Sequence, residues 1–439
     1  MESLTVDQSK IMDHIVLGEN LFITGGAGVG KTHVIHSLID SLQHKNIGIT
    51  STTGISAILI KGATLHSFLG IGLGVNSTEV LHGSIMKRKQ IRDRWQKLEI
   101  LVIDEISMLT AALFDKLEEL ARLIRDSVLP FGGIQLILSG DFCQLPPIGV
   151  MNGREQFCFE SESWPHCIGQ DNVILLTEII RQKDKQFQRA LNNIRMGRID
   201  DDTKAIFAPC IGRKFNKQLG VKPTKLFPLN NMVDIINEKE LMKTANTKHN
   251  QQEFYQYDRE TTGHPKPLKN RAIQAVIDRY VKSCIVPEKL ELCVGCQVML
   301  VHNLTPTPGD AHQRDQHKLV NGSRGVVKRF INDLPFVSFT NGKECIIDYH
   351  TWDIEQDDVK IGEMTQIPLR LGYAFSIHKS QGCSLDLVSM DLSKIFDYGM
   401  GYVAMSRAHT LEGLSIKAID WNQIKVHPKV LEYYESIEK

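Results

Sequence analysis

The chain has 439 residues, and its 51 Lys and Arg balance its 51 Asp and Glu, so the formal net charge is zero. A chain of this length predicts about three domains. The charge balance excludes a uniformly basic protein, so any nucleic-acid-binding surface must be local.

The nine cysteines are scattered and form no disulfide framework, which favours a reducing compartment. Cys293 and Cys296 form a lone C-x-x-C with no second pair at zinc spacing, and we interpret both as small residues of a strand. No apolar run approaches the roughly 18 residues of a membrane span, and no signal-peptide pattern follows Met1. We therefore expect a soluble, intracellular protein of the cytoplasm or nucleus, with no membrane partner.

The first predicted element is a helix near the N-terminus, which Thr5 can cap and whose apolar face is Ile11, Ile15 and Val16. Gln8 lies on its first turns, shortly before a glycine-rich loop. A glutamine amide offers the donor and the acceptor that the edge of adenine requires. A solvated helix residue is the alternative interpretation of Gln8.

Residues 21–32 carry the most informative motif. A short apolar run leads into a glycine-rich turn, and Gly25 to Thr32 fit the pattern G-x-x-x-x-G-K-T. Glycines let the backbone curl around a phosphate, so that N–H groups and the positive end of the next helix face the phosphate oxygens. We predict that Lys31 binds the β- and γ-phosphates of ATP and that the Thr32 hydroxyl ligates Mg²⁺. The predicted nucleotide-binding set is Gln8, Gly25, Gly26, Ala27, Gly28, Val29, Gly30, Lys31, Thr32 and His33.

Further apolar runs predict buried strands, and residues 31–44 between the first two predict an amphipathic helix. Continuous apolar runs separated by helical stretches indicate a parallel α/β sheet covered on both faces. Ligands of such a sheet bind beyond the carboxyl ends of its strands. After the run at 21–25, the predicted strands lie at residues 47–49, 100–103, 134–138 and 173–176.

Polar residues follow two of these strands. Asp104 and Glu105 end the third strand, where a pair of carboxylates is costly unless a cation or a reaction uses it. We predict that Asp104 holds Mg²⁺ and that Glu105 orients and deprotonates the attacking water; an N-cap carboxylate is the alternative for one of them. The fourth strand leads to Gln144 on a loop that Pro146 and Pro147 keep irregular, where a glutamine can sense the γ-phosphate.

Together with the second half of the chain, these motifs resemble superfamily 1 DNA helicases of the petite-integration-frequency (PIF) type, near the RecD-like and Dda-like helicases. The resemblance runs in order from about residue 4 to residue 414. This sequence departs from the family pattern in two ways. Ile180 stands where the family more usually has phenylalanine. The chain also lacks long flanking extensions, and this second difference predicts a minimal motor. The stretches that carry the resemblance are 25–32, 49–57, 62–68, 102–108, 140–147, 177–197, 225–230, 294–300, 319–325, 372–382 and 401–408.

The resemblance implies two RecA-like parallel-sheet P-loop domains with two small insertions, one of them an SH3-like β-barrel. Short strands with turn signals between Val301 and Thr365, including Asn341-Gly342, agree with the barrel. The expected domains are residues 1–60 and 98–178 (ATP-binding core), 61–97 (wedge-like insertion), 179–302 and 364–439 (second RecA-like domain) and 303–363 (barrel).

The implied activity is that of an ATP- and Mg²⁺-dependent DNA helicase with a monomeric core, which translocates 5′ to 3′ on single-stranded DNA and unwinds forked duplex DNA. DNA replication, repair and recombination are the processes such an enzyme serves. The resemblance makes Arg181 and Arg407 expected arginine fingers that reach across the cleft between the core domains. The expected catalytic set is Lys31, Glu105, Gln144, Arg181 and Arg407.

The resemblance also extends the list of binding residues. Gln381 and Gly382 join the nucleotide-binding set, and stacking or polar contacts with DNA are expected from Thr53, His66, Phe68, His378 and Lys379. For His66, Phe68 and His378, a place in the core is an equally good interpretation.

The insertion at 61–97 ends in six basic residues, which either grip DNA phosphates or form a solvated helix face. We expect residues 76–94 to be replaceable by a short linker without loss of ATP turnover. The six are Lys87, Arg88, Lys89, Arg92, Arg94 and Lys97.

Two other functions remain open. One is a nucleic-acid-stimulated ATPase that remodels protein–DNA complexes without unwinding. The other is a P-loop nucleotide switch protein, against which stand the missing N-K-x-D motif and the presence of Glu105 with two candidate arginines.

Overall fold

A computed structural model gives the fold, and the chain divides into two compact units. The first unit comprises Met1–Pro209, Ser393–Leu411 and Asp420–Lys439, and the second comprises Cys210–Leu392 and Glu412–Ile419. The structure describes residues 6–42, 44–215, 222–247, 250–251, 253–263, 277–278, 281, 286–302, 304, 319, 323–340, 342–356 and 359–437.

The compact units differ from the predicted domains in one respect. Residues 179–209, 393–411 and 420–439 pack with the unit that contains the phosphate loop, although they were expected in the second domain. The predicted domain boundaries themselves stay a prediction.

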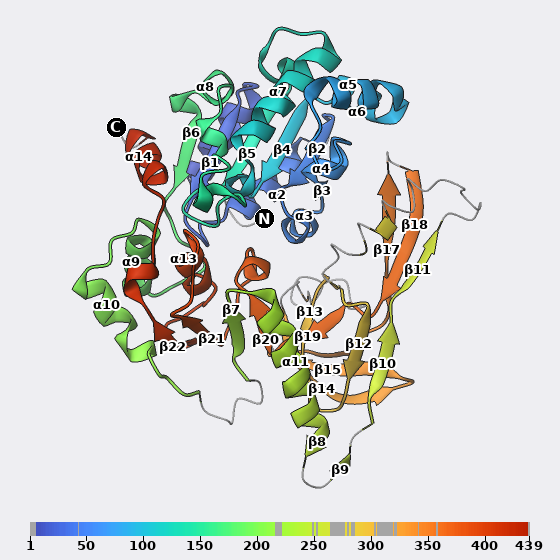
Figure 1. Ribbon diagram of the computed structural model, residues 1–439, viewed down its shortest axis with the longest axis vertical. Helices are drawn as coiled ribbons and strands as arrows, with labels where there is room; N and C mark the ends of the chain where they lie inside the picture. Colours follow the sequence, from blue (N-terminus) through green and yellow to red (C-terminus); the bar gives the residue numbers. More distant parts are fainter. Residues whose placement is uncertain are drawn as a thin grey trace. The chain divides into compact units, whose positions relative to one another are not determined.

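A six-stranded sheet forms the centre of the first unit, in the order β3-β2-β4-β5-β1-β6 (Figure 1). Every neighbouring pair in it is parallel, with Phe22 beside both Leu138 and Val173. The five strands that the apolar runs predicted are therefore confirmed, but the edge strand β6 is only partly buried, with Leu176 as its one buried residue. The strands are β1 (Leu21–Gly25), β2 (Ile47–Ser51), β3 (Ala63–Thr64), β4 (Ile100–Asp104), β5 (Gln135–Gly140) and β6 (Val173–Leu176).

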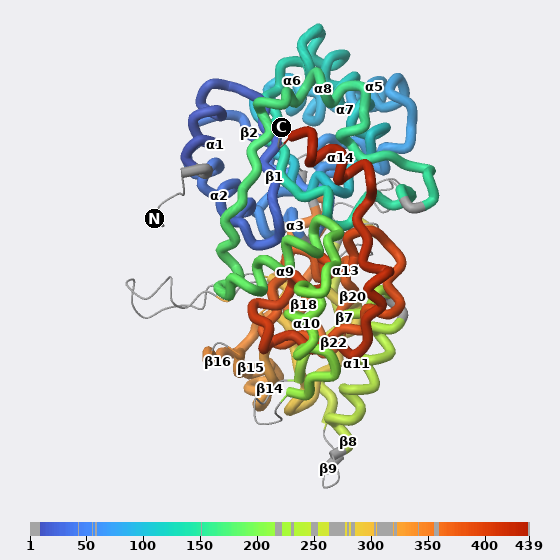
Figure 2. The backbone as a smooth tube through the Cα atoms, turned by 90° about the vertical axis from the view of Figure 1, so that its left-hand side faces the viewer, coloured from blue at the N-terminus to red at the C-terminus, as the bar shows by residue number. Residues whose placement is uncertain are grey.

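Both faces of this sheet are covered by helices. Phe22, Leu101 and Leu136 pack in one hydrophobic cluster with α7 (Ala111–Arg125), whereas their neighbours Leu21 and Ile100 pack in a second cluster with α1 and α2. Figure 2 shows α1 and α2 on one side of β1 and α7 on the other. Because side chains alternate along a strand, a strand buried on both faces is apolar throughout. The helices of this unit are α1 (Val6–Val16), α2 (Lys31–Ser41), α3 (Gly54–Leu59), α4 (Leu65–Phe68), α5 (Thr78–Lys87), α6 (Lys89–Lys97), α7, α8 (Trp164–Cys167), α9 (Lys185–Arg195), α10 (Asp201–Phe207), α13 (Met400–Met405) and α14 (Pro428–Ile437).

The predicted apolar face of α1 is partly wrong. Ile11 and Ile15 are buried, but Val16 is 76% exposed. Successive residues of a helix point about 100° apart, so Ile15 and Val16 cannot both face a narrow contact. Thr5 and the side chain of Gln8 lie outside the described residues.

The second unit contains its own parallel sheet, in the order β20-β7-β21-β22, with α11 (Asn230–Ala245) packed against it. Each unit thus has one parallel sheet, which agrees with the predicted α/β class. The strands are β7 (Thr224–Phe227), β20 (Ala374–Ser376), β21 (Val388–Leu392) and β22 (Leu414–Ile419).

The rest of the second unit is antiparallel and has its own hydrophobic cluster. A five-stranded sheet runs β16-β15-β14-β13-β19 and a three-stranded sheet runs β11-β18-β17. The short strands predicted near residues 325, 336 and 345 are confirmed, whereas their closure into an SH3-like barrel stays a prediction; Asn341 lies outside the described residues. The strands are β8 (Asn246–Thr247), β9 (Asn250–Gln251), β10 (Tyr255–Asp258), β11 (Glu260–Gly263), β12 (Lys289–Leu292), β13 (Gln297–Leu300), β14 (Arg324–Ile331), β15 (Leu334–Phe339), β16 (Glu344–Ile346), β17 (His350–Gln356), β18 (Val359–Gln366) and β19 (Leu369–Leu371).

The interpretation of Cys293 and Cys296 as strand residues is wrong. Both are buried in the second unit's cluster, but they lie in the turn between β12 and β13, where Gly295 has a φ of 83°.

In the described part of the chain, no helix is both long and apolar enough to span a bilayer.

Candidate functional site

The glycine-rich loop lies between β1 and α2, as the motif predicts. Gly28 and Gly30 both have a φ of 86°, in the left-handed region that side chains with a Cβ disfavour. Gly25 is fixed by space as well, because a Cβ there would lie 2.3 Å from the Leu176 carbonyl oxygen of β6. The loop can therefore take this form only with glycine at these positions.

Lys31, the first residue of α2, folds back over the loop. Its Nζ donates hydrogen bonds to the carbonyl oxygens of Gly25 (2.7 Å) and Gly26 (3.0 Å). Burial lowers the pKa of the Lys31 ammonium, while the carboxylates of Asp141 and Glu105 act in the opposite direction. The ammonium thus lies within the loop, at the N-terminus of a helix that favours anions.

The predicted carboxylate pair ends β4. The two oxygens of buried Asp104 accept hydrogen bonds from Ser56 Oγ (2.9 Å) and Ser139 Oγ (2.8 Å). Glu105 is one of few non-glycine residues with a positive φ, 55°, a conformation that costs free energy and is found at functional sites. Its backbone carbonyl accepts a hydrogen bond from Thr52 Oγ1 (2.7 Å), which helps to hold that conformation.

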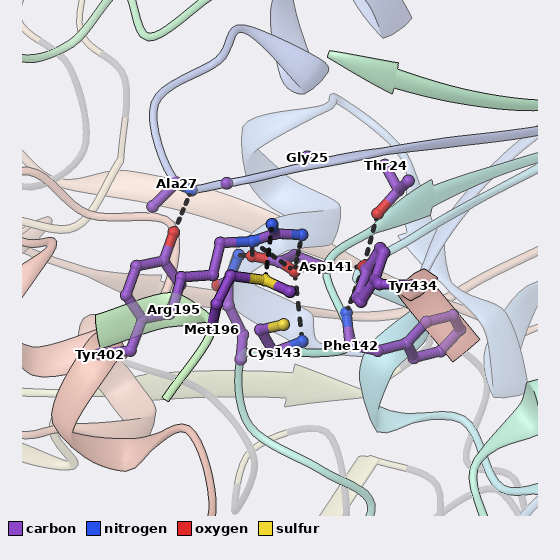
Figure 3. A network of polar contacts seen from close by, with 12 residues as sticks. Thr24, Gly25, Ala27, Asp141, Phe142, Cys143, Arg195, Met196, Tyr402 and Tyr434 are labelled. Atoms are coloured by element: carbon purple, nitrogen blue, oxygen red, sulfur yellow. Dashed lines mark hydrogen bonds and ion pairs between the residues drawn. The ribbon is translucent and has the colours of Figure 1, made fainter. Parts of the chain in front are cut away.

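A buried ion pair lies beside the loop, and sequence reasoning missed it. The Asp141 carboxylate, fully buried after β5, accepts hydrogen bonds from Nε (3.0 and 3.1 Å) and Nη2 (2.9 Å) of Arg195 in α9 (Figure 3). Burial alone would raise the pKa of Asp141, but the Arg195 and Lys31 cations hold it below its usual range. Breaking such a pair by removing one partner is strongly destabilising, because a buried charge is left alone.

The pattern of α9 contains a signal that could have revealed this pair. Phe187, Leu191 and Ile194 form its buried face, and Arg195 is buried next to them. A charged residue that helical periodicity places at the edge of an apolar face needs a partner of opposite charge. The nearby partner, Asp141, follows the fourth predicted strand, in a loop where only Gln144 was expected to have a role.

Gln144 lies in the loop after β5, as predicted, and is buried. Its Nε2 is 3.5 Å from Asp141 Oδ2, at the outer limit of a hydrogen bond. Gly399, before α13, approaches this loop so closely that a Cβ would lie 2.2 Å from the Gln144 carbonyl oxygen. The Gln144 side chain is thus held next to the ion pair.

Both candidate arginines belong to the same compact unit as the phosphate loop, which differs from the expectation that they reach it across a cleft between the core domains. Their role as arginine fingers stays a prediction. The backbone N of Arg181 donates to the Gly28 carbonyl oxygen (3.1 Å), and its Nη1 donates to the Ser406 carbonyl oxygen (3.3 Å). Arg407 is buried, and its Nε and Nη2 donate to Val403 O and Ser406 Oγ, both at 2.9 Å. Ser406 therefore contacts both arginines, and the structure brings them to one place.

Comparison with known proteins identifies the family. A sequence model of the PIF1-like helicase family matches residues 3–205. The ATP-dependent DNA helicase PIF1 of Xenopus laevis is 37% identical over 99% of this chain and 65% of its own length. The crystal structure of the Pif1 helicase from Candida albicans has a TM-score of 0.79 at 34% identity, with 100% of both chains covered. The chain belongs to the PIF1 family of helicases.

A further PIF1-family structure, Bacteroides Pif1 in complex with ADP-AlF3 and single-stranded DNA, has a TM-score of 0.67 at 27% identity and covers 100% of this chain and 98% of its own. Family membership confirms the predicted PIF resemblance and the α/β fold with two RecA-like domains. The chain spans only 65% of the Xenopus relative.

The DNA contacts expected from the PIF1 resemblance fall in both units. In the first, Thr53 Oγ1 accepts a hydrogen bond from Ser56 N (3.2 Å) at the start of α3. Burial lowers the pKa of His66 in α4, so its neutral form is favoured. Phe68 packs against the hydrophobic cluster with the Arg94 guanidinium 4.9 Å above its ring, which favours a place at the core's edge.

The remaining binding candidates lie in the second unit, in the short segment after β20. Lys379 is exposed as a residue, but the partial burial of its ammonium group and the neighbouring Arg370 cation lower its pKa. Gln381 is buried, and Gly382 has a φ of 77°. His378 begins this segment's single helical turn. Their roles stay predictions.

The insertion at 61–97 is not separable from the first unit. Leu81, Ile85, Ile91 and Trp95 of α5 and α6 are buried in the same cluster as α7. The expectation that residues 76–94 can be replaced by a linker is therefore wrong, since the change would remove three buried apolar side chains, and each such loss costs about 2–5 kcal/mol.

The six basic residues of the insertion divide into two groups. Arg88 and Arg94 donate hydrogen bonds to the carbonyl oxygens of Gly70 and Phe68, and Arg92 contacts Met86 and Asp93. The three lysines are exposed. Only the lysines can be changed without loss of these contacts within the domain.

Substitution of Lys87, Lys89 and Lys97 by Ala together should slow the unwinding of a tailed duplex by roughly fivefold at physiological salt, because phosphate contacts of exposed cations dominate DNA affinity. ATP turnover at saturating single-stranded DNA should stay within twofold. A charge-matched control replaces three exposed cations elsewhere in this unit, Lys185, Arg189 and Arg198, by Ala. Equal effects of the two triple variants on unwinding would show that the lysine surface has no special role.

Proposed function

We propose that this chain is an ATP-dependent DNA helicase that translocates 5′ to 3′ on single-stranded DNA and unwinds duplex DNA. The observation that carries the proposal is one constellation in the first unit: a phosphate loop with its lysine, a carboxylate pair after β4, and two arginines joined at Ser406. A protein that only binds a nucleotide does not need the second and third parts. The relatives named ATP-dependent DNA helicase support the proposal.

The residues take the following roles in ATP hydrolysis. The loop N–H groups and Lys31 bind the β- and γ-phosphates, and Glu105 orients the attacking water and accepts its proton. Arg181 and Arg407 stabilise charge on the transferred phosphoryl group, and Gln144 senses the γ-phosphate. The Bacteroides Pif1 structure contains ADP-AlF3, which supports a nucleoside triphosphate as the substrate.

The residues present fit a magnesium ion. Thr32 is exposed at the start of α2. Among the described residues, each Asp104 oxygen accepts one serine hydroxyl, so lone pairs are left for a bound cation or its water. Oxygen donors are what Mg²⁺ prefers. Held by Thr32 and Asp104, Mg²⁺ would neutralise charge on the phosphate oxygens.

We propose single-stranded and forked DNA as partners, with the core acting as a monomer. Contacts would come from Thr53, His66, Phe68, His378 and Lys379, whose types suit sequence-independent stacking and phosphate binding. The single-stranded DNA in the Bacteroides Pif1 complex supports this choice of partner.

ATP turnover measured with and without single-stranded DNA tests the proposal first. We expect stimulation of at least tenfold, because DNA binding completes the arrangement needed for hydrolysis. Turnover that does not respond to DNA would favour a nucleotide switch instead. Stimulated turnover without unwinding of a forked duplex would favour the remodelling ATPase.

A further inference from the structure

The hydroxyl group of Tyr434, in α14, lies at a junction of three segments that are far apart in sequence (Figure 3). It is 2.7 Å from Thr24 Oγ1 of β1, 3.1 Å from the backbone N of Phe142 and 3.2 Å from Asp141 Oδ1. Tyr434, Thr24 and Asp141 are all buried. The hydroxyl therefore joins the strand that leads into the phosphate loop to the loop that carries Gln144.

The protons of this junction can be assigned. Phe142 N–H must donate to the Tyr434 oxygen, and the ionised Asp141 must accept the hydroxyl proton of Tyr434. Thr24 Oγ1 then donates its own proton to the Tyr434 oxygen, which thereby accepts two hydrogen bonds and donates one. Every polar group here is satisfied, and such a complete buried network holds its members rigidly.

The same network extends to the phosphate loop on its other side. The Arg195 guanidinium lies 4.7 Å above the ring of Tyr434 while it pairs with Asp141. A second tyrosine, Tyr402 of α13, accepts a hydrogen bond from the backbone N of Ala27 within the loop (2.6 Å). A Cβ at Gly26 would lie 3.1 Å from the Tyr402 oxygen and 3.5 Å from Arg195 Cδ. Arg195 of α9 and Tyr402 of α13 thus lie against the loop, whereas Tyr434 of α14 contacts the strand that leads into it.

Asp141 also links this network to the lysine of the loop. Among the carboxylates that face Lys31, Asp141 has the largest effect on its ammonium, ahead of Glu105 and Asp104. The Asp141 carboxylate thus pairs directly with Arg195 and acts on Lys31 through its charge. A shift of this carboxylate changes the electrostatic environment in which Lys31 binds phosphate.

We propose that Tyr434 is a positioning residue for ATP hydrolysis, whose hydroxyl fixes the Asp141 carboxylate and the Phe142–Gln144 loop against β1 and so sets the geometry at the γ-phosphate. This inference rests on the proposed ATPase function. It makes α14 part of the nucleotide site, although α14 contains none of the residues that would contact ATP.

Replacement of Tyr434 by Phe removes one oxygen and keeps the ring under Arg195. Asp141, Thr24 and Phe142 N each lose a partner, so the Phe142–Gln144 segment loses its side-chain link to β1, although Gly140 stays paired with Thr24 in the sheet. A displacement of 1 Å can cost as much as about 10²-fold in rate, so we expect kcat for DNA-stimulated ATP hydrolysis to fall roughly tenfold. Binding of ADP, which has no γ-phosphate, should stay within twofold, as should affinity for single-stranded DNA.

Tyr433 provides the matched control. It is the preceding residue of the same helix, and its buried hydroxyl makes none of the hydrogen bonds of this network. Its ring packs against Phe142 (5.5 Å) and Trp164 (6.3 Å), contacts that a phenylalanine would keep. Tyr433→Phe should leave kcat within twofold. A similar loss of kcat in both variants would overturn the proposal, because it would mean that α14 acts only through general packing.

A double-mutant cycle with Thr24→Val tests the specific link. If the two hydroxyl groups act through one junction, the double variant should be no slower than Tyr434→Phe by more than about twofold. Losses that multiply, or an unchanged kcat of Tyr434→Phe in a preparation whose unsubstituted chain hydrolyses ATP, would overturn the inference. Lack of ATP turnover by the unsubstituted chain would instead refute the proposed function.

Discussion

Lys31→Ala is expected to abolish measurable ATP turnover and unwinding, with a loss of at least about 10³-fold, because the charge that binds the β- and γ-phosphates is removed. The variant should still fold. The Lys31 ammonium donates hydrogen bonds to two carbonyl oxygens of its own loop, and Lys31 belongs to neither of the two hydrophobic clusters on the faces of the first unit's sheet. Steady-state ATP hydrolysis with saturating single-stranded DNA measures the effect, and thermal unfolding confirms the fold.

Two further variants separate charge from packing. Lys31→Met keeps most of the side-chain volume and should be as inactive as Lys31→Ala. Lys45→Ala removes a lysine of the same unit that pairs with Glu99 on the surface, and such pairs contribute only about 0–1 kcal/mol. It should hydrolyse ATP normally. ATP turnover by folded Lys31→Met within tenfold of the unsubstituted chain would contradict the assignment of the phosphate site.

Arg407→Ala is expected to reduce kcat about 10³-fold while ATP binding stays largely intact, because an arginine finger acts mainly in the transition state. Arg407→Lys should recover little of this rate, since a lysine cannot reproduce the planar fork of donors. Arg181→Ala should lower kcat in the same way. Turnover and equilibrium binding of a non-hydrolysable ATP analogue measure the two effects separately.

The control for Arg407 is an arginine with a structural role. Arg125 Nη1 donates to the carbonyl oxygens of Trp95, Gln96 and Leu98 at the end of α6. Arg125→Ala should lower the melting temperature and leave kcat of the folded protein unchanged. If Arg407→Ala instead lost only DNA affinity at normal kcat, its role as a finger would be wrong.

The sheet and the phosphate loop could be predicted from sequence because their signals are local. Each buried strand of the first unit is a continuous apolar run, and the conformation of Gly25, Gly28 and Gly30 requires glycine at fixed spacing. The carboxylate pair followed from the same logic. A parallel sheet brings the carboxyl ends of its strands to one edge, so residues at the ends of β1 and β4 must lie there.

The buried network of Asp141, Arg195, Thr24 and Tyr434 could not be predicted in this way. Asp141 and Arg195 are 54 residues apart, and Thr24 and Tyr434 are 410 apart, so no spacing rule connects them. For segment 61–97, the error was to predict a separable surface insertion where the structure has part of the core. Its basic residues drew attention to its surface, while its buried Leu81, Ile85 and Ile91 make it part of the core.

Directional unwinding driven by ATP hydrolysis is the activity proposed for this chain, and one assay tests it directly. Two duplexes of equal length and sequence carry a single-stranded tail on either the 5′ or the 3′ side, and strand separation is followed with ATP and Mg²⁺. We predict efficient unwinding of the 5′-tailed duplex, little of the 3′-tailed one, and none of either by Lys31→Ala. Equal unwinding of both duplexes, preference for the 3′ tail, or no unwinding while ATP is hydrolysed would contradict the claim.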